Sequence, residues 1–149
     1  MSPRQTKTAS FDRPALAPEQ IENLRRGAEH FNAGRFFEAH EDWEIRWRHL
    51  PPVERPQVQA AILVCGVFVL LEKRRLDPAM RLAKLAVERF AEAAAQSALH
   101  DSKATLRLPD AEDRMLRVLA RIRLGESDAD RLRSEAIGLR ANLADRGKD

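Results

Sequence analysis

The sequence predicts an all-α protein, a compact bundle of about five to six antiparallel helices. Apolar residues recur at helical spacing in six segments, and Pro, Gly and Asp residues stand where such segments begin or stop. No segment is convincing as a strand. The chain has 149 residues, 44% of them hydrophobic and 33% charged, which is the composition of one folded, soluble domain.

The first two predicted helices form a hairpin. The first begins at Pro18, a residue suited to an opening helical turn, and ends before Gly34, which can adopt the left-handed conformation that closes a helix. The second covers residues 36–49 and ends before Pro51. Because the connection is short, the two helices should pack antiparallel.

The next two predicted helices complete the core. Residues 56–74 are apolar nearly all round, which indicates a central helix. The apolar run from Val58 to Leu71 is shorter than the roughly 20 residues that span a membrane, so no membrane association is expected. Asp77 and Pro78 should begin a fourth helix that reaches about residue 98. The wide apolar face of that helix would permit a homodimer.

A polar stretch, residues 100–109, precedes the last predicted pair of helices. Asp110 should cap the fifth helix, which Gly125 ends, and the sixth should bury Leu132, Ala136, Leu139 and Leu143. The predicted organisation is a loose tail at 1–16, a four-helix core at 17–99 and a helix pair at 100–149 packed on the core.

Charge and cysteine content exclude several classes of function. The 26 cations and 23 anions are nearly balanced, and the arginines at 114, 117 and 121 are interspersed with acids, so we expect a solvated helix face and no nucleic-acid binding. The single cysteine, Cys65, lies in an apolar run and should be buried and inert. A cytoplasmic protein is the expectation.

The segment from Phe36 to Trp47, FFEAHEDWEIRW, holds the candidate site. Phe36, His40, Trp43 and Trp47 share one helix face, which predicts that His40 and both tryptophans are largely buried. Glu44 lies one turn beyond His40, so we expect His40 to contact either Glu44 or a group on the helix predicted at 56–74. Glu41 lies three residues before Glu44.

We expect Glu41 and Glu44 to be folded with His40 into the interior of the helix hairpin. Because a buried carboxylate needs a partner, two interpretations of this cluster are open. In the structural one, His40, Arg46, Arg48 or Gln59 is the partner of the acids, and the cluster fixes how the helices pack. In the other, His40 and Glu44 hold a divalent metal, the one cofactor that the pattern suggests. A third ligand would then come from Glu41, Glu38 or another helix.

The same residues resemble a known family of small helical proteins, domain of unknown function 309. The resemblance covers about residues 21–90 and rests on the spaced elements Phe31-Asn32, Gly34, Phe36 to Glu41, Glu44, Trp47-Arg48, Gln59 and Ile62. It implies a helical bundle in which His40, Glu41, Glu44, Trp47 and Gln59 converge. Members have been labelled predicted metal-dependent hydrolases, but this chain has Leu70 where many carry a histidine, which weakens that implication.

Two functions follow as hypotheses. The favoured one is a non-catalytic module that binds an unknown protein or small molecule, because residues 31–39 resemble the turn of a tetratricopeptide-type hairpin. The alternative is a metal-dependent hydrolase, in which a cation on His40 and Glu44 activates water and Glu41 is the general base.

Overall fold

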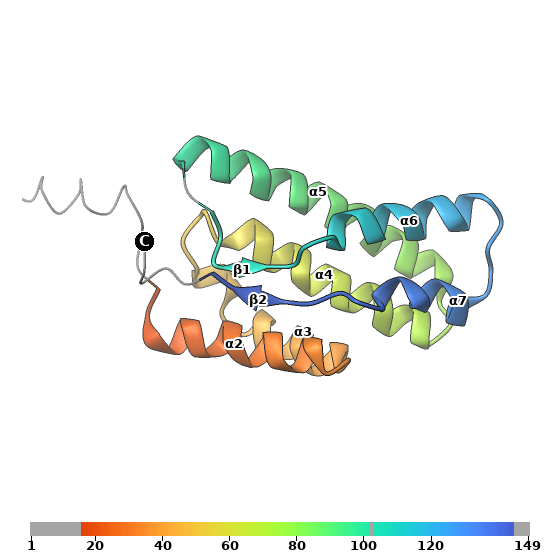
Figure 1. Ribbon diagram of the computed structural model, residues 1–149, viewed down its shortest axis with the longest axis horizontal. Coiled ribbons are helices and arrows are strands. Elements are labelled where there is room, and N and C mark those ends of the chain that lie inside the picture. Colours follow the sequence, from red (N-terminus) through yellow and green to blue (C-terminus); the bar gives the residue numbers. More distant parts are fainter. Residues whose placement is uncertain (1–15, 102, 145–149) are drawn as a thin grey trace, which may run out of the picture.

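The computed structural model describes residues 16–101 and 103–144, and it confirms the all-α class. Figure 1 shows α4 in the centre, with α5 along one side and the α2–α3 hairpin along the other. The helices are α2 (Pro18–Asn32), α3 (Phe36–Glu44), α4 (Arg55–Glu72), α5 (Leu76–His100), α6 (Ala111–Arg123) and α7 (Ala129–Arg133). Residues 1–15 of the predicted tail lie outside the described residues.

The core is centred on α4, as its apolar sequence predicted. This helix packs against α3 and α5, and Val58, Val64 and Leu71 are completely buried. By length and composition Arg55–Glu72 could cross a membrane, but more than half of it is covered by the rest of the protein. We therefore regard α4 as the core helix of a compact fold.

The predicted second helix is shorter than expected. It ends at Glu44, and a 3-10 turn at Trp47–His49 follows. Leu50 precedes a proline, so it adopts an extended conformation, and its side chain inserts into the core with 4% of its surface exposed. The chain must leave the helix to place Leu50 there, and Trp47 consequently does not continue the helix face of His40 and Trp43.

The predicted sixth helix is wrong beyond Arg133. The chain continues as a 3-10 turn, Ser134–Ala136, and then as an extended segment in which Gly138 adopts a φ of 85°. Leu139 and Ala141 are buried while Arg140 between them is exposed, so burial alternates as in a strand. The C-terminal region is therefore one helix, one short helix and a strand.

That strand pairs with a second one, although no strand was predicted. β1 (Leu106–Arg107) and β2 (Asn142–Leu143) are antiparallel, with Leu106 opposite Leu143. The segment before α6 was expected to be a polar connection, but residues 104–106 and Leu108 are buried. After α7 the chain runs back past α4, beside β1 (Figure 1).

Two polar side chains attach these C-terminal segments to the four-helix core. The amide of Asn32, at the end of α2, donates to the Ala141 carbonyl at 2.9 Å and accepts from the Ala141 N–H at 2.7 Å. The carboxyl group of Glu54 accepts from the Thr105 N–H at 2.6 Å and from its hydroxyl at 2.8 Å. Glu54 is completely buried.

Candidate functional site

The aromatic residues of the α2–α3 hairpin build a core cluster that holds the hairpin in place. The rings of Phe31 and Phe36 lie 5.1 Å apart, and Phe36 in turn lies 5.2 Å from Phe68 of α4. Trp43 is buried as predicted, and its indole N–H donates to the Leu24 carbonyl of α2 at 3.1 Å. The arrangement fixes which side of α3 faces inward.

Trp43 lies directly on the backbone of α2 at Gly27. A Cβ at this position would lie 2.1 Å from the indole nitrogen, a distance that no real side chain tolerates. Gly27 is therefore required by the close approach of the ring, not by its own backbone conformation.

His40 lies at the edge of this core and not inside it. Its side chain is 33% exposed, and its Nε2 lies 3.1 Å from a carboxylate oxygen of Glu44. The predicted contact between His40 and Glu44 is confirmed. The ring also stacks on Phe37, with centroids 6.2 Å apart, while its Nδ1 is covered and receives no hydrogen bond from any described residue.

The predicted burial of the two acids is wrong. Glu41 and Glu44 are both exposed, with 53% of the Glu44 side chain open to solvent. Because buried Ala39 and Trp43 set the rotation of α3, positions 41 and 44 face outward. The energetic requirement for neutralising a buried charge therefore does not apply to this cluster.

Of the other predicted site residues, Trp47 and Arg48 lie in the 3-10 turn that follows α3. Trp47 is partly buried and packs against the hydrophobic core, and the Arg48 guanidinium lies 5.7 Å from the centre of its ring. Glu44, Trp47 and Arg48 line a polar hollow of about 300 Å³ together with Ile45 and His49. Gln59 is half-buried on α4.

The donors for a metal site do not converge. Within residues 16–101 and 103–144, no three His, Cys, Asp or Glu side chains are placed to share an ion. His40 and Glu44 could supply two ligands, which is fewer than protein zinc sites use. Glu41, the expected general base, faces solvent.

Cys65 is completely buried in α4, as expected, and burial raises the pKa of its thiol well above the ordinary range. We predict no reaction with Ellman's reagent in native buffer up to about pH 9, because little thiolate forms and the sulfur is covered. One thiol per chain should react in denaturant, and absorbance at both conditions measures this. Rapid native labelling would contradict the packing of α4.

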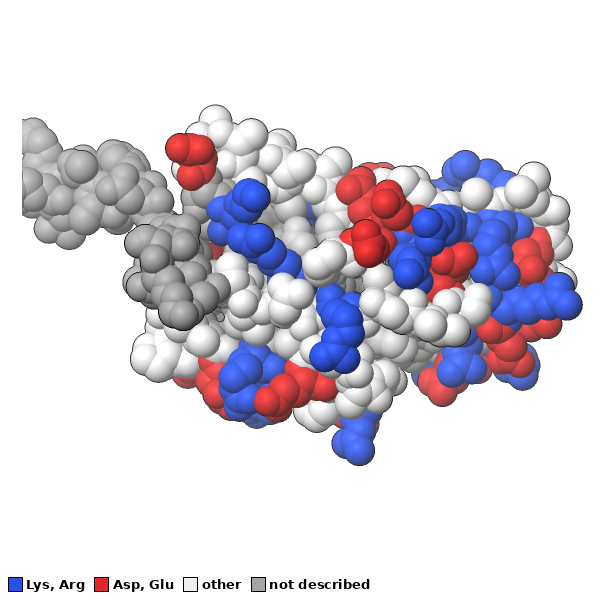
Figure 2. Space-filling model, in the orientation of Figure 1, with Lys and Arg blue, Asp and Glu red and all other residues white. Residues whose placement is uncertain are grey.

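The arginine ridge of α6 is occupied by structural contacts. Arg114 donates to the carbonyls of Glu135 and Ile137, and Arg121 pairs with Glu126 and Glu135 at 3.4 and 3.0 Å. Figure 2 shows blue and red side chains intermixed over α6 and α7. These contacts attach the turn after α7 to α6.

Two polar pairs were not recognised in the sequence, one between His30 and Asp42 and one between Glu54 and Thr105. His30 of α2 has its Nδ1 2.6 Å from an Asp42 oxygen of α3. Glu54 holds Thr105, as described above. Each pair joins segments that are distant in the chain, so no local spacing indicated it.

Comparison with known proteins agrees with the resemblance found in the sequence. No curated protein and no solved structure matches the chain at a significant level. A family model described as Domain of unknown function (DUF309) matches residues 24–82. This span begins at Leu24, whose carbonyl accepts a hydrogen bond from Trp43, and it contains every residue of the candidate site. Residues 24–82 of this chain are therefore similar to the family described as Domain of unknown function (DUF309).

Proposed function

We propose that the protein is a non-catalytic interaction module that binds a partner protein through the exposed face of α3. The observation that supports it is a stripe of solvent-facing side chains formed by Phe37, Glu41, Glu44 and Ile45. The two apolar members are 54% and 64% exposed, an arrangement that costs hydration free energy unless a partner covers them.

The charge of this stripe favours a basic partner. Glu38 and Glu41 are exposed and make no ion pair within the described part of the chain, and Glu44 pairs only with His40 there. A partner with Lys or Arg on either side of an apolar side chain would complement acids that flank Phe37. Such pairing gives orientation and association rate more than affinity.

The polar hollow at the end of α3 would receive one anchoring side chain of the partner. Its lining includes Glu44, Trp47 and Arg48, and the Arg48 guanidinium lies over the Trp47 ring. His40 has a positioning role in this proposal, because it stacks on Phe37 and contacts Glu44. A cytoplasmic location is part of the same proposal.

A displayed library of random peptides tests this directly, with the full chain as bait. We expect enriched peptides to combine Arg or Lys with an apolar residue, and to lose binding at least about tenfold to a Glu38→Lys/Glu41→Lys variant. Phe37→Ser should have a similar effect. Glu88→Lys/Glu92→Lys on α5 makes the same charge change at two other exposed acids and should leave binding unchanged. No enrichment, or enrichment insensitive to the α3 variants, would overturn the proposal.

A separate experiment tests the alternative function, a metal-dependent hydrolase. Among the described residues, no third donor joins His40 and Glu44 around one ion, so we expect zinc or manganese to shift the melting temperature by less than about 1 °C. Differential scanning calorimetry of tag-free protein, with and without each metal, measures this. If a metal raised the melting temperature by several degrees, and His40→Ala abolished this effect, the result would support the hydrolase hypothesis.

A further inference from the structure

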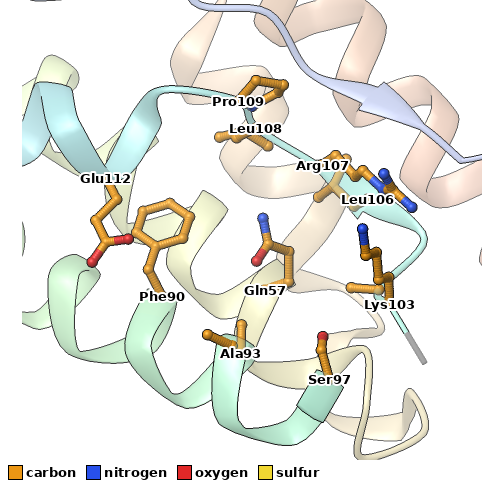
Figure 3. Close-up of a pocket in the computed structure, with 12 residues that line it drawn as sticks. Gln57, Phe90, Ala93, Ser97, Lys103, Leu106, Arg107, Leu108, Pro109 and Glu112 are labelled. Carbon is orange, nitrogen blue, oxygen red and sulfur yellow. The ribbon is translucent and has the colours of Figure 1, made fainter. Parts of the chain in front are cut away.

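A second hollow lies on the other side of the molecule's core, between α5 and the segment that leads into α6. It has a volume of about 460 Å³ and contains residues of α4, α5 and 103–112 (Figure 3). This volume falls in the range of small-molecule sites, roughly 300–1,000 Å³. None of the residues of the α3 face contributes to it.

The walls of this groove are mostly apolar. Phe90 and Ala93 of α5 form one side, and Leu106 and Leu108 form the other. Gln57 of α4 lies between them with its amide directed into the groove (Figure 3). The amide makes no hydrogen bond within the described residues, so it is available to a ligand.

The polar ends of the groove have opposite charges. Lys103 and Arg107 are exposed, lie together at one end, and make no ion pair with any described acid (Figure 3). Glu112 lies at the other end, beside Phe90 (Figure 3). One anionic group is therefore favoured near the two cations, and a second anion is disfavoured at the far end.

The wall that carries the cations is held in place. Thr105, between Lys103 and Arg107, is hydrogen-bonded through its N–H and hydroxyl to buried Glu54, and Leu106 and Arg107 pair with β2. A preformed wall lowers the entropy cost of binding.

We infer that this groove binds a small monocarboxylic acid with an apolar body. The carboxylate would contact Lys103, Arg107 and the Gln57 amide, since the guanidinium fork matches its two oxygens. The apolar body would lie along Phe90, Ala93 and Leu108. Because the groove is open to solvent along one side, we expect a Kd on the order of 0.1–1 mM.

Titration of the ¹⁵N-labelled full chain with octanoate tests the inference by NMR. We expect saturable shifts of the Gln57 side-chain amide and of the backbone amides of Ala93 and Leu106. Octanamide, which keeps the chain and loses the charge, should bind at least about tenfold more weakly, and so should suberate, whose second carboxylate would approach Glu112. Inorganic phosphate should cause no saturable shift in the groove.

Two variants distinguish the cations from the apolar walls. Lys103→Gln/Arg107→Gln should weaken octanoate about tenfold, whereas Arg81→Gln/Lys84→Gln, on an exposed part of α5 outside the groove, should not. Ala94→Trp should block the groove without changing charge, and a thermal melt checks that each variant is folded. Equal binding of octanoate and octanamide, unchanged binding in the double variant, or no saturable shift below about 10 mM would overturn the inference.

Discussion

Replacing Gly27 with alanine is expected to destabilise the protein by about 3 kcal/mol, although the same change in an exposed helix stabilises by about 1 kcal/mol. The added methyl group would overlap the Trp43 indole, 2.1 Å from its nitrogen. Trp43 is 1% exposed and enclosed by Phe31 and the rest of the core, so the ring has little room to move. Urea unfolding followed by tryptophan fluorescence and circular dichroism measures the loss.

Gly66 of α4 provides the matched control. A Cβ there would lie 2.7 Å from a terminal methyl of Leu82, which can rotate away, so Gly66→Ala should cost less than about 1 kcal/mol. As a second check, Trp43→Phe replaces the indole with a smaller ring. Gly27→Ala should therefore cost less unfolding free energy in the Trp43→Phe background than in the wild type. Equal losses for the two glycine variants, or additivity of Gly27→Ala with Trp43→Phe, would show that the indole does not impose the glycine.

Replacing Glu54 with alanine is the second change with a large expected effect, a loss of about 3–4 kcal/mol. The carboxyl group is completely buried and accepts two hydrogen bonds from Thr105. Its removal leaves buried donors in the 103–108 segment without this acceptor and opens a cavity beside α4. Hydrogen exchange should also show early opening of β1, since the segment loses its attachment to the core.

Graded variants separate the hydrogen bonds from the packing. Glu54→Gln keeps one acceptor oxygen and most of the volume, and it should cost less than the alanine variant. Thr105→Val removes only the hydroxyl and should cost about 1–2 kcal/mol. If Glu54→Ala unfolds at the same urea concentration as the wild type, the carboxyl group does not hold the segment.

The helices were predictable from the sequence wherever periodicity and end signals agreed. Pro18 begins α2 as expected, α4 occupies Arg55–Glu72 close to the predicted 56–74, and α6 stops before Gly125. The C-terminal strand was missed because the spacing of Leu132, Ala136, Leu139 and Leu143 fits a helix. From Leu139 onward the same letters also alternate with period two, and only the partner strand decides between the two interpretations.

The candidate site was predicted in part. The contact of His40 with Glu44 follows from the spacing of four residues within one helix and is present. The burial of the acids was wrong because buried Ala39 and Trp43 set the rotation of α3, and this rotation turns positions 41 and 44 toward solvent. Glu54 gave no local signal, because its partner Thr105 is 51 residues away.

The two hydrogen bonds between Asn32 and Ala141 join residues that are 109 positions apart in the chain. Asn32 ends the first described helix, and Ala141 lies close to the last described residue. During synthesis the α2–α3 hairpin leaves the ribosome long before residue 141 does, so the Asn32 amide must remain hydrated while α4, α5 and α6 form. Closure of so long a loop is late and slow compared with helix formation. We therefore expect nascent chains released before residue 141 to bind chaperones and to be cleaved more readily by proteases than the finished protein.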